Sequence, residues 1–339
     1  MKNKKYILGV DGGNTKTDYF LFDTEGNFID AMRFGTCSHE ALKDSFSGTR
    51  MVMGEHLNIL FDKNNITIDD VEAASFGLAG ADIKSQKDNL NMILKEIGFK
   101  CFQMDNDGIL GLKAASPNGR GVCSINGTGT VCVGVDEDDH FLQVGGIGYI
   151  SGDEAGGAYM VRRCFQVIYQ QFLRCGEPTT LTQRIFDLFK INSIESFLEK
   201  IVELSIHGKT ERTKIIKIIF EEAKNNDPVA LSILEETGKN MALGVAGCIN
   251  NSKFDSKVYV VLAGSVWSKA SNDIQVRYFE KYLKENTNKK FQIIILDETP
   301  AYGAIIWAFE LYLKKHPDSE LISRIKNQVL ENQKNLPST

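Results

Sequence analysis

Prolines, closely spaced cysteine pairs and excess basic residues are all scarce in this sequence, and each scarcity argues against a class of protein. The chain has 6 prolines among 339 residues and no Pro/Ser-rich tract, so a long flexible linker is not expected. Its 7 cysteines include no pair at C-x-x-C spacing, which argues against a zinc knuckle or a disulfide scaffold. Its 39 basic and 44 acidic residues give a net charge of −5, so no broad positive excess can neutralise nucleic-acid phosphates. We therefore expect no nucleic-acid partner.

Long apolar runs are also missing. No stretch approaches the roughly 20 apolar residues that span a bilayer, so we expect no membrane partner. The apolar stretch behind the basic N-terminus covers only residues 6–10 before Asp11, which is too short for a signal peptide. These features predict a cytoplasmic protein. The composition, 42% hydrophobic and 24% charged, is ordinary for globular proteins, and the length favours two domains.

The first third of the chain predicts a mixed α/β sheet. Apolar runs separated by glycine turns predict three consecutive strands at residues 6–10, 17–23 and 28–34. This is not a Rossmann start, in which a helix follows the first strand. Helices and strands then alternate, with helices expected at 38–61, 84–97 and 107–115 and strands at 73–78 and 100–104.

The same pattern restarts after residue 116, which predicts two related halves. Strands are expected at 121–126, 130–135, 141–144, 258–262 and 292–296, and helices at 300–313 and in the tail 316–339. Residues 154–250 read as mostly helical. We therefore predict an N-terminal domain over 1–115 and a C-terminal domain over 116–339, with a helical insertion at about 154–250.

Two glycine turns between strands offer phosphate-binding chemistry. The segment DGGNTKT, residues 11–17, combines an acidic strand end, two glycines and hydroxyl and ammonium donors, which suit phosphate oxygens. Asp11 there could hold a magnesium ion, which uses few carboxylates. The segment INGTGT, residues 125–130, repeats the arrangement in the second half. The alternative for each turn is a plain glycine hairpin, but two such turns could grip a polyphosphate from both sides of a cleft.

Three further segments contain candidate site residues. Residues 145–158, GGIGYISGDEAGGA, hold six glycines before a helix start, which exceeds what a helix cap requires and favours a ligand loop. In residues 260–267, VVLAGSVW, a buried strand is followed by small residues. These residues would let a purine or ribose approach the backbone, or they form an ordinary strand-to-helix connection. Residues 105–108, DNDG, place carboxylates at a strand-to-helix junction, as a general base or as helix caps.

These segments, taken in this order, resemble the N-acetylglucosamine kinase and BadF/BadG/BcrA/BcrD ATPase family of the sugar kinase, Hsp70 and actin superfamily. The resemblance covers residues 7–308. Its most specific part is GYISGDEAGGAY, residues 148–159, which is similar to the family's GWG-x-x-x-GDEGS run. The segments VDGGNTKT, NGTGT, LAGSV and PAYGA match the family's two phosphate loops, its adenosine segment and the helix start after it.

The resemblance implies two actin-like (ribonuclease H-like) domains, each a mixed sheet flanked by helices, with an ATP cleft between them. It implies ATP and Mg²⁺ as cofactors, an amino sugar as the substrate and a homodimer as the assembly. Asp11 would bind the magnesium ion. The residues implied to bind the nucleotide are Asp11, Gly12, Gly13, Thr15, Lys16, Thr17, Thr128, Gly129, Thr130, Gly264 and Ser265. Those implied to bind the sugar are Ser38, His39, Asp107, Gly146 and Asp153.

The resemblance also implies the reaction. Asp107 matches the catalytic aspartate of the sugar kinases and would accept the hydroxyl proton as that oxygen attacks the γ-phosphorus, with Asp105 as the alternative base. N-acetylglucosamine, converted to its 6-phosphate, is the expected acceptor. Ile147, Asn126 and Ser38 depart from the sugar-kinase pattern near the acceptor, so glucosamine, N-acetylmuramate and other amino sugars stay open. The alternative function is an ATPase that activates a partner enzyme.

Overall fold

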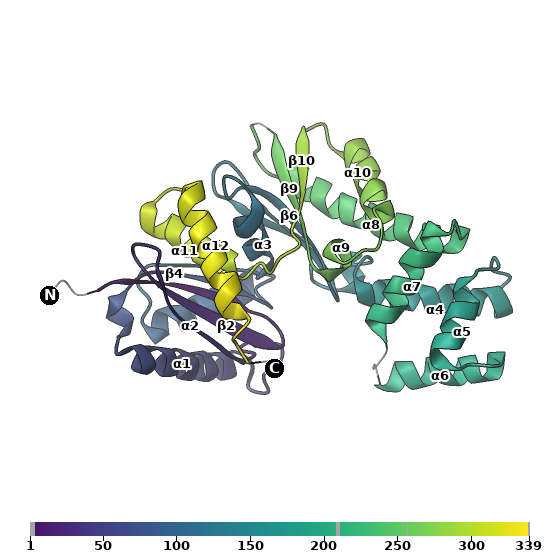
Figure 1. Ribbon diagram of the computed structural model, residues 1–339, viewed down its shortest axis with the longest axis horizontal. Helices are drawn as coiled ribbons and strands as arrows, with labels where there is room; N and C mark the ends of the chain where they lie inside the picture. The colour runs from purple at the N-terminus through teal and green to yellow at the C-terminus, as the bar shows by residue number, and fades with distance from the viewer. Residues whose placement is uncertain (1–3, 208–210, 256, 338–339) are drawn as a thin grey trace.

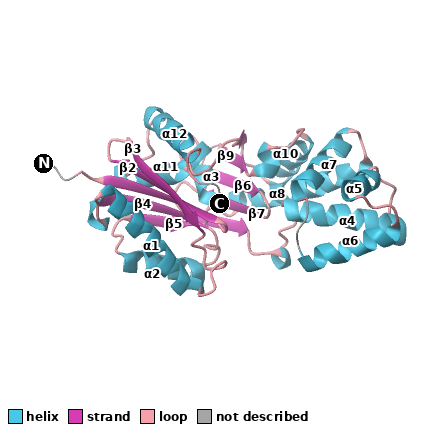
Figure 2. Cartoon of the chain, turned by 60° about the horizontal axis from the view of Figure 1, so that its bottom comes forward, coloured by secondary structure: helices cyan, strands magenta, loops and turns pink. Residues whose placement is uncertain are grey.

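The computed structural model describes residues 4–207, 211–255 and 257–337. The strands form two five-stranded sheets with helices packed around them (Figures 1 and 2). The first sheet has the order β3-β2-β1-β4-β5. Its strands are β1 (Tyr6–Gly12), β2 (Lys16–Asp23), β3 (Phe28–Gly35), β4 (Val71–Leu78) and β5 (Phe102–Asp105). The strands β1, β2 and β3 pair antiparallel, whereas β4 and β5 continue the sheet in parallel.

The second sheet repeats this arrangement with the order β10-β9-β6-β7-β8. Its strands are β6 (Gly121–Asn126), β7 (Thr130–Val135), β8 (Phe141–Gly145), β9 (Val258–Ala263) and β10 (Phe291–Ile295). Again three consecutive strands pair antiparallel, and two later strands add in parallel. The prediction of two mixed sheets flanked by helices is confirmed.

Helices cover both faces of the first sheet because its central strands are buried on both sides. In β1, Leu8 and Val10 pack beneath α1 (Ser45–Asn64) and α2 (Lys84–Ile97), while Ile7 faces α3 (Gly108–Ala115) and α11 (Tyr302–Leu313). This alternation follows the two-residue period of a strand. Short 3₁₀ turns lie at η1 (Ile68–Asp70) and η2 (Tyr149–Ser151).

The segment between β8 and β9 is helical. Its helices are α4 (Gly157–Leu173), α5 (Leu181–Phe189), α6 (Ile194–His207), α7 (Arg212–Lys224) and α8 (Pro228–Asn250). They share a core with the following α9 (Ser265–Ser268) and α10 (Ile274–Asn286). In α7, Ile215 and Ile219 are fully buried in this core.

The C-terminal helices return to the first sheet. Helix α11 contacts α3, β1 and β4, and α12 (Ser319–Gln333) contacts β3. In Figure 1 both helices, in yellow, lie beside the first sheet. The division into residues 1–115 and 116–339 stays a prediction. The contacts show that the C-terminal helices α11 and α12 pack on the N-terminal sheet. The tail forms the expected helix as α12, while residues 338–339 lie outside the described part.

Two predicted helix starts are wrong. The helix expected from residue 38 begins at Ser45, because residues 38–44 form turns in which Ala41 and Leu42 donate to the Ser38 carbonyl. The helix expected from Pro300 begins at Tyr302, and the Pro300 carbonyl instead accepts from Gly303 N. In both places, local turn hydrogen bonds replace the first helical turn.

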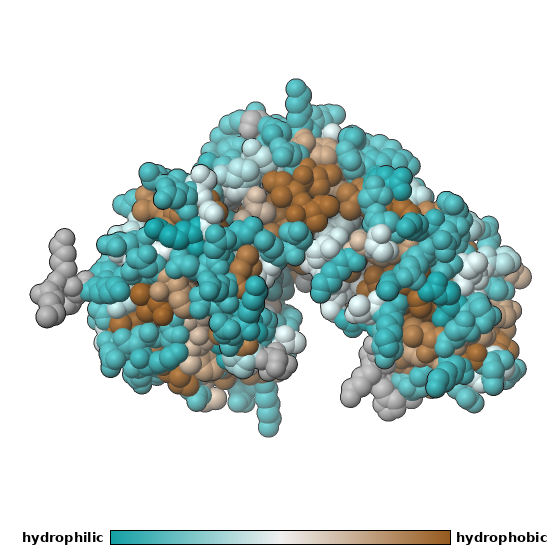
Figure 3. Space-filling model, in the orientation of Figure 1, coloured by the Kyte–Doolittle hydropathy of each residue, from teal (hydrophilic) through white to brown (hydrophobic). Residues whose placement is uncertain are grey.

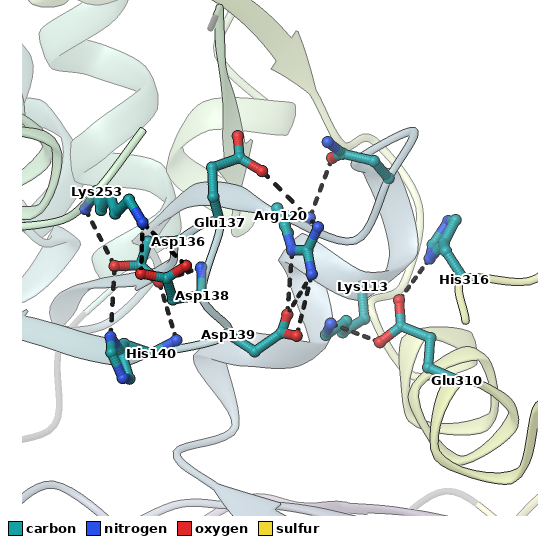
Figure 4. Close-up of polar contacts among 11 residues, drawn as sticks. Lys113, Arg120, Asp136, Glu137, Asp138, Asp139, His140, Lys253, Glu310 and His316 are labelled. Carbon is teal, nitrogen blue, oxygen red and sulfur yellow. Dashed lines mark hydrogen bonds and ion pairs between the residues drawn. The ribbon is translucent and has the colours of Figure 1, made fainter. Parts of the chain in front are cut away.

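Polar contacts hold α3 at its C-terminal end (Figure 4). Lys113 of α3 is 5% exposed, and its Nζ lies 2.5 Å from Glu310 Oε2 on α11. Glu310 also contacts His316. Arg120, just beyond α3, pairs with Asp139 at 3.0 Å. These ion pairs tie the C-terminal end of α3 to α11 and tie the residue before β6 to the turn between β7 and β8. In the described residues, no helix is both long and apolar enough to cross a membrane.

Candidate active site

A deep notch separates the N-terminal half from the helical insertion α4–α7 (Figure 3). Two tight strand-to-strand turns belong to the candidate site. The first joins β1 to β2, and Gly13 N donates to Lys16 O at 2.9 Å across it. Asp11 at the end of β1 is partly buried, and Thr15 at the tip is exposed. A Cβ at Gly12 would lie 2.6 Å from Leu78 Cδ2, so a larger residue there would require the Leu78 side chain to move.

Two of the residues that the resemblance assigns to the phosphates are engaged within the protein. The Lys16 ammonium lies 2.8 Å from Asp18 Oδ2, and the Arg33 guanidinium holds the same carboxylate. Thr17 is fully buried, and its hydroxyl accepts from Cys37 N at 3.2 Å. In this structure, Asp11, Thr15 and the backbone of the first turn are the groups left for a ligand.

The second turn joins β6 to β7 and is closed by Gly127 N donating to Gly129 O at 3.1 Å. A Cβ added at Gly127 or Gly129 would meet no described atom within 4 Å. Neither glycine has a positive φ, so neither backbone strain nor protein packing explains them. Both glycines therefore leave open space at the turn. Thr128 is exposed and accepts from Arg212 Nη1 at 2.7 Å, while the Thr130 hydroxyl lies 2.7 Å from Met241 Sδ.

The glycines before α4 have a packing reason. Gly157 N and Ala158 N donate to the carbonyls of Gly127 and Thr128 at 2.8 and 3.0 Å. A Cβ at Gly156 would lie 2.7 Å from the Gly129 backbone. The first turn of α4 therefore supports the second glycine turn from behind.

The predicted adenosine segment lies directly beside this turn. Gly264 has φ +101°, and a Cβ there would lie 2.5 Å from the Asn126 carbonyl oxygen. Ser265 is exposed at the start of α9. Both side-chain polar atoms of Asn126 are buried without a hydrogen-bond partner in the described chain.

Asp107 lies where the two sheets meet. It immediately precedes α3, and Gly108 next to it packs against Val133 and Ile125 of the second sheet. Asp107 does not cap α3. Asn106 takes that role, because its Oδ1 accepts from Gly108 N at 2.8 Å. The Asp107 side chain makes no cap hydrogen bond at the start of α3.

The two aspartates Asp107 and Asp11 interact electrostatically. Burial, followed by the charges of Asp11 and Asp82, raises the pKa of Asp107 to about 7, against the lowering effect of the Gly108 and Asp107 backbone N–H groups. Burial and the charge of Asp18 raise the pKa of Asp11 to about 6, against the lowering effect of Lys16 and Arg33. A carboxyl group that titrates near neutral pH suits a general base, and buried carboxylates that repel each other suit a bound cation.

Asp105 has a different environment. Its carboxylate lies 2.7 Å from Lys87 Nζ and also accepts from Asn106 N at 2.7 Å. Its side chain is therefore tied to α2 and to the backbone. Of the two candidate bases, Asp107 is the one with an uncommitted carboxylate.

The residues expected to bind sugar come from both halves. Ser38 and His39 are buried. Ser38 Oγ lies 3.4 Å from Ala79 O, and His39 stacks on Phe46 with ring centroids 4.1 Å apart. His39 Nδ1 has no hydrogen-bond partner among the described residues. In the second half, Asp153 Oδ2 accepts from Gly148 N at 2.6 Å.

Gly146 has a steric reason to be glycine. It has φ +82°, and a Cβ there would meet Gln143 Nε2 and Val131 at 2.9 Å. Both Gly146 and Asp153 therefore shape the loop after β8, and the Asp153 carboxylate is partly used in holding that loop.

Sequence reasoning missed the segment after β4. Ala79 N donates to Gly12 O at 2.7 Å, and a Cβ at Gly80 would lie 2.8 Å from His39. Asp82 then accepts from Asn106 Nδ2 and from Gln143 Nε2 of β8, each at 2.8 Å. The available signal was the run LAGAD, residues 78–82, in which small residues and a carboxylate follow a buried strand.

Residues 8–308 match the BadF/BadG/BcrA/BcrD ATPase family. The chain belongs to this family. Among curated relatives, it is 26% identical over 319 residues to an N-acetylmuramic acid/N-acetylglucosamine kinase of Clostridium acetobutylicum, covering 90% of this chain and 98% of that protein. It is 24% identical over 243 residues to an N-acetyl-D-glucosamine kinase of Dictyostelium discoideum, covering 68% and 75% of the two chains.

A solved structure from Chromobacterium violaceum, provisionally named an N-acetylglucosamine kinase, superposes with a TM-score of 0.62 at 18% identity. The match covers 90% of this chain and 99% of that chain. This likeness confirms the predicted actin-like fold of two mixed-sheet halves.

Proposed function

We propose that this protein is an ATP-dependent kinase that phosphorylates a hydroxyl of an amino sugar. The observation that carries the proposal is the position of Asp107. An uncommitted carboxylate, with its pKa raised to about 7, stands between the two sheets near Asp11 of the first glycine turn. Family membership and the amino sugar kinases among the curated relatives support the same reaction.

ATP would lie between the two glycine turns. The backbone around Gly13, Gly127 and Gly129 leaves room for phosphate oxygens, and the Thr15 and Thr128 hydroxyls are exposed beside it. Gly264 and Ser265 would border the adenosine. Backbone N–H groups of tight turns and hydroxyl groups suit phosphates.

Asp11 is the candidate ligand for magnesium. Its half-buried carboxylate, raised in pKa by burial and by Asp18, would be stabilised by a cation. Magnesium keeps several waters and needs few protein carboxylates, so a single aspartate fits. When bound with ATP, the ion would offset negative charge on the phosphates.

Asp107 would act as the general base, accepting the proton of the attacking sugar hydroxyl. Its ionised form must be present for this step, and a pKa of about 7 leaves a large ionised fraction at neutral pH. Ser38, His39, Gly146 and Asp153 would surround the sugar. Buried His39 Nδ1, which has no hydrogen-bond partner in the described chain, is available for a sugar group.

N-acetylglucosamine is the acceptor we expect, with phosphate transferred to its 6-hydroxyl. The test is to incubate the protein with magnesium-ATP and separate sugars: N-acetylglucosamine, glucosamine, N-acetylmuramate and glucose. Phosphorus NMR then identifies the product and the phosphorylated position. Formation of N-acetylglucosamine 6-phosphate supports the proposal. Phosphorylation of another amino sugar instead would keep the kinase function and change only the identity of the acceptor.

The alternative is an ATPase that activates a partner enzyme. That role uses cysteines to bridge an iron–sulfur cluster at a dimer interface. Cys123 and Cys132, which flank the second glycine turn, are 0% and 3% exposed, and burial raises the pKa of the Cys132 thiol to about 12. Buried protonated thiols suit packing rather than cluster binding. ATP consumption that no sugar changes would favour this alternative over the kinase.

A further inference from the structure

One carboxylate oxygen, Asp82 Oδ1, connects the two halves beside His39 and Gly146, which are expected to bind the sugar. Asp82 lies in the loop between β4 and α2. Its Oδ1 accepts from Asn106 Nδ2 in the first half and from Gln143 Nε2 on β8 of the second half, each at 2.8 Å. Gln143 Nε2 is close to Gly146, where an added Cβ would lie 2.9 Å away. The glycine thus leaves room for the link.

We propose that Asp82 is a positioning residue for the base Asp107, acting through Asn106, and that its bond to Gln143 sets the spacing of the two halves around the acceptor. This inference rests on the proposed kinase function. Asp82 itself is not assigned a contact with substrate.

The Asn106 side chain is fixed from both of its ends. Its Nδ2 donates to Asp82, and its Oδ1 accepts from Gly108 N at 2.8 Å, while its backbone N donates to Asp105. An amide held by Asp82 presents its oxygen to the start of α3. The Asp107 side chain then makes no cap hydrogen bond to α3. Without Asp82 the amide can rotate, and Asp107 can compete for the helix end.

The Gln143 contact reaches across the molecule. Gln143 Nε2 also lies 3.1 Å from the Gly145 carbonyl, at the start of the loop that leads to Asp153. The loop expected to bind sugar is thereby tied through Asp82 to the segment that holds the base. A misplacement of about 1 Å between binding loop and base can reduce a rate by roughly 100-fold.

The charge of Asp82 adds a second, separable effect. The charges that face Asp107 are Asp11 on β1 and Asp82, and both raise its pKa. Asp82 in turn faces His39, whose pKa is lowered by burial. The nearby Lys87 is paired with Asp105, and Lys16 is paired with Asp18. Removing the Asp82 charge alone should therefore lower the pKa of Asp107.

The experiment compares Asp82→Asn, Asp82→Ala and Gln143→Ala, with the exposed Asp88→Asn on α2 as the control. Sugar-dependent ADP release is measured from pH 5.5 to 9. Asp82→Asn keeps an oxygen for both hydrogen bonds, so kcat at pH 8.5 should stay within about twofold of wild type, while the acid limb of kcat/KM moves to lower pH by roughly 0.5 unit. Asp82→Ala should lose about 10-fold in kcat with KM for ATP unchanged. Gln143→Ala should raise KM for the sugar about fivefold and leave the acid limb in place.

The proposal is overturned if Asp82→Asn leaves the acid limb at the wild-type pH and Gln143→Ala leaves KM for the sugar unchanged. These two variants test the role of Asp82 even if Asp82→Ala does not fold, since each keeps at least one of the two hydrogen bonds that join residue 82 to Asn106 and Gln143. If wild-type protein consumes no ATP in response to any sugar, the kinase function itself fails. If wild type responds to sugar and only the variants behave unexpectedly, the function stands and the role of Asp82 is refuted.

Discussion

Asn106 caps α3 in place of its neighbour Asp107: Asn106 Oδ1 accepts from Gly108 N at 2.8 Å. That Asn106, and not Asp107, accepts from the helix N–H has a chemical consequence. Asp and Asn are both good helix caps, but an aspartate that caps a helix has its charge stabilised by backbone donors and becomes a weaker base. Asn106 holds the Gly108 N–H, and burial, followed by the charges of Asp11 and Asp82, raises the pKa of Asp107 to about 7 although nearby backbone N–H groups lower it.

Replacing Asn106 should therefore damage catalysis more than stability. We expect Asn106→Ala to cost about 1 kcal/mol of unfolding free energy, typical of a lost cap, and to reduce kcat roughly 10-fold as Asp107 takes over the cap. Asn106→Ser is the matched control because serine also caps helices, and it should retain more activity. Denaturant unfolding and steady-state kinetics measure both effects. Equal kcat values for the two variants would contradict the argument.

Asp107 should make the ligand-free protein less stable at alkaline pH. Its folded pKa of about 7 is above the ordinary value of 3.8, so the folded state binds an extra proton between these values and loses stability as the pH rises through them. Asp107→Asn removes this cost and should stabilise the protein by about 1–2 kcal/mol at pH 8, after allowance for solvent contact. The gain should disappear near pH 4. Thermal unfolding of both proteins at the two pH values tests it, and an equal difference at both would argue against the raised pKa.

The same pKa predicts the pH dependence of the reaction. The base must be ionised, so kcat/KM should fall tenfold per unit as the pH drops below about 7, the pKa of Asp107. Initial rates at subsaturating sugar, measured in buffers of constant ionic strength, give this limb. A rate that stays level down to pH 5.5 would mean that Asp107 is not the titrating base. ATP and its magnesium complex must be kept saturating, because their own ionisation would otherwise distort the limb.

Gly129 of the second glycine turn and Gly156, which packs behind that turn, should respond differently to substitution. Gly129→Ala meets no described atom within 4 Å, so stability should change by less than about 0.5 kcal/mol while KM for ATP rises roughly 10-fold. Gly156→Ala would place its Cβ 2.7 Å from the Gly129 backbone and should destabilise the protein by about 1–3 kcal/mol. Thermal unfolding and ATP titration separate the two. An unchanged KM for ATP in Gly129→Ala would remove the main reason for placing phosphates at this turn.

Much of this fold could be predicted from the sequence because its strands are short apolar runs bounded by glycine turns. The two sheets and the helix at 108–115 follow directly from that pattern. The start of α1 could not be predicted, since turn hydrogen bonds to the Ser38 carbonyl decide it. Segment patterns alone did not reveal that α11 packs on β1, which depends on contacts between residues about 300 positions apart.

Some residues of the candidate site could likewise be predicted from the sequence, and others could not. Residues in compact motifs, such as Asp11 and Gly129, stand out from the sequence because glycine and hydroxyl clusters are local signals. Asp82 and Gln143 do not stand out, because their importance arises from a hydrogen bond between residues 61 positions apart. The ion pair of Lys16 with Asp18 was likewise invisible, although the two residues are close in sequence. The sequence predicts a strand that begins at residue 17 and so leaves Lys16 out, whereas in the structure both side chains lie on one face of β2 and Arg33 binds the same carboxylate.

The most direct test of the account is the rate of ADP release with magnesium-ATP and N-acetylglucosamine for wild type, Asp107→Asn and Asp105→Asn. The account predicts release that depends on the sugar, a loss of about 10²–10⁴-fold in Asp107→Asn, and a loss of less than about 10-fold in Asp105→Asn, whose carboxylate is tied to Lys87. Circular dichroism must show both variants folded. Sugar-dependent release that survives in Asp107→Asn, or that is lost in Asp105→Asn instead, would contradict the central assignment.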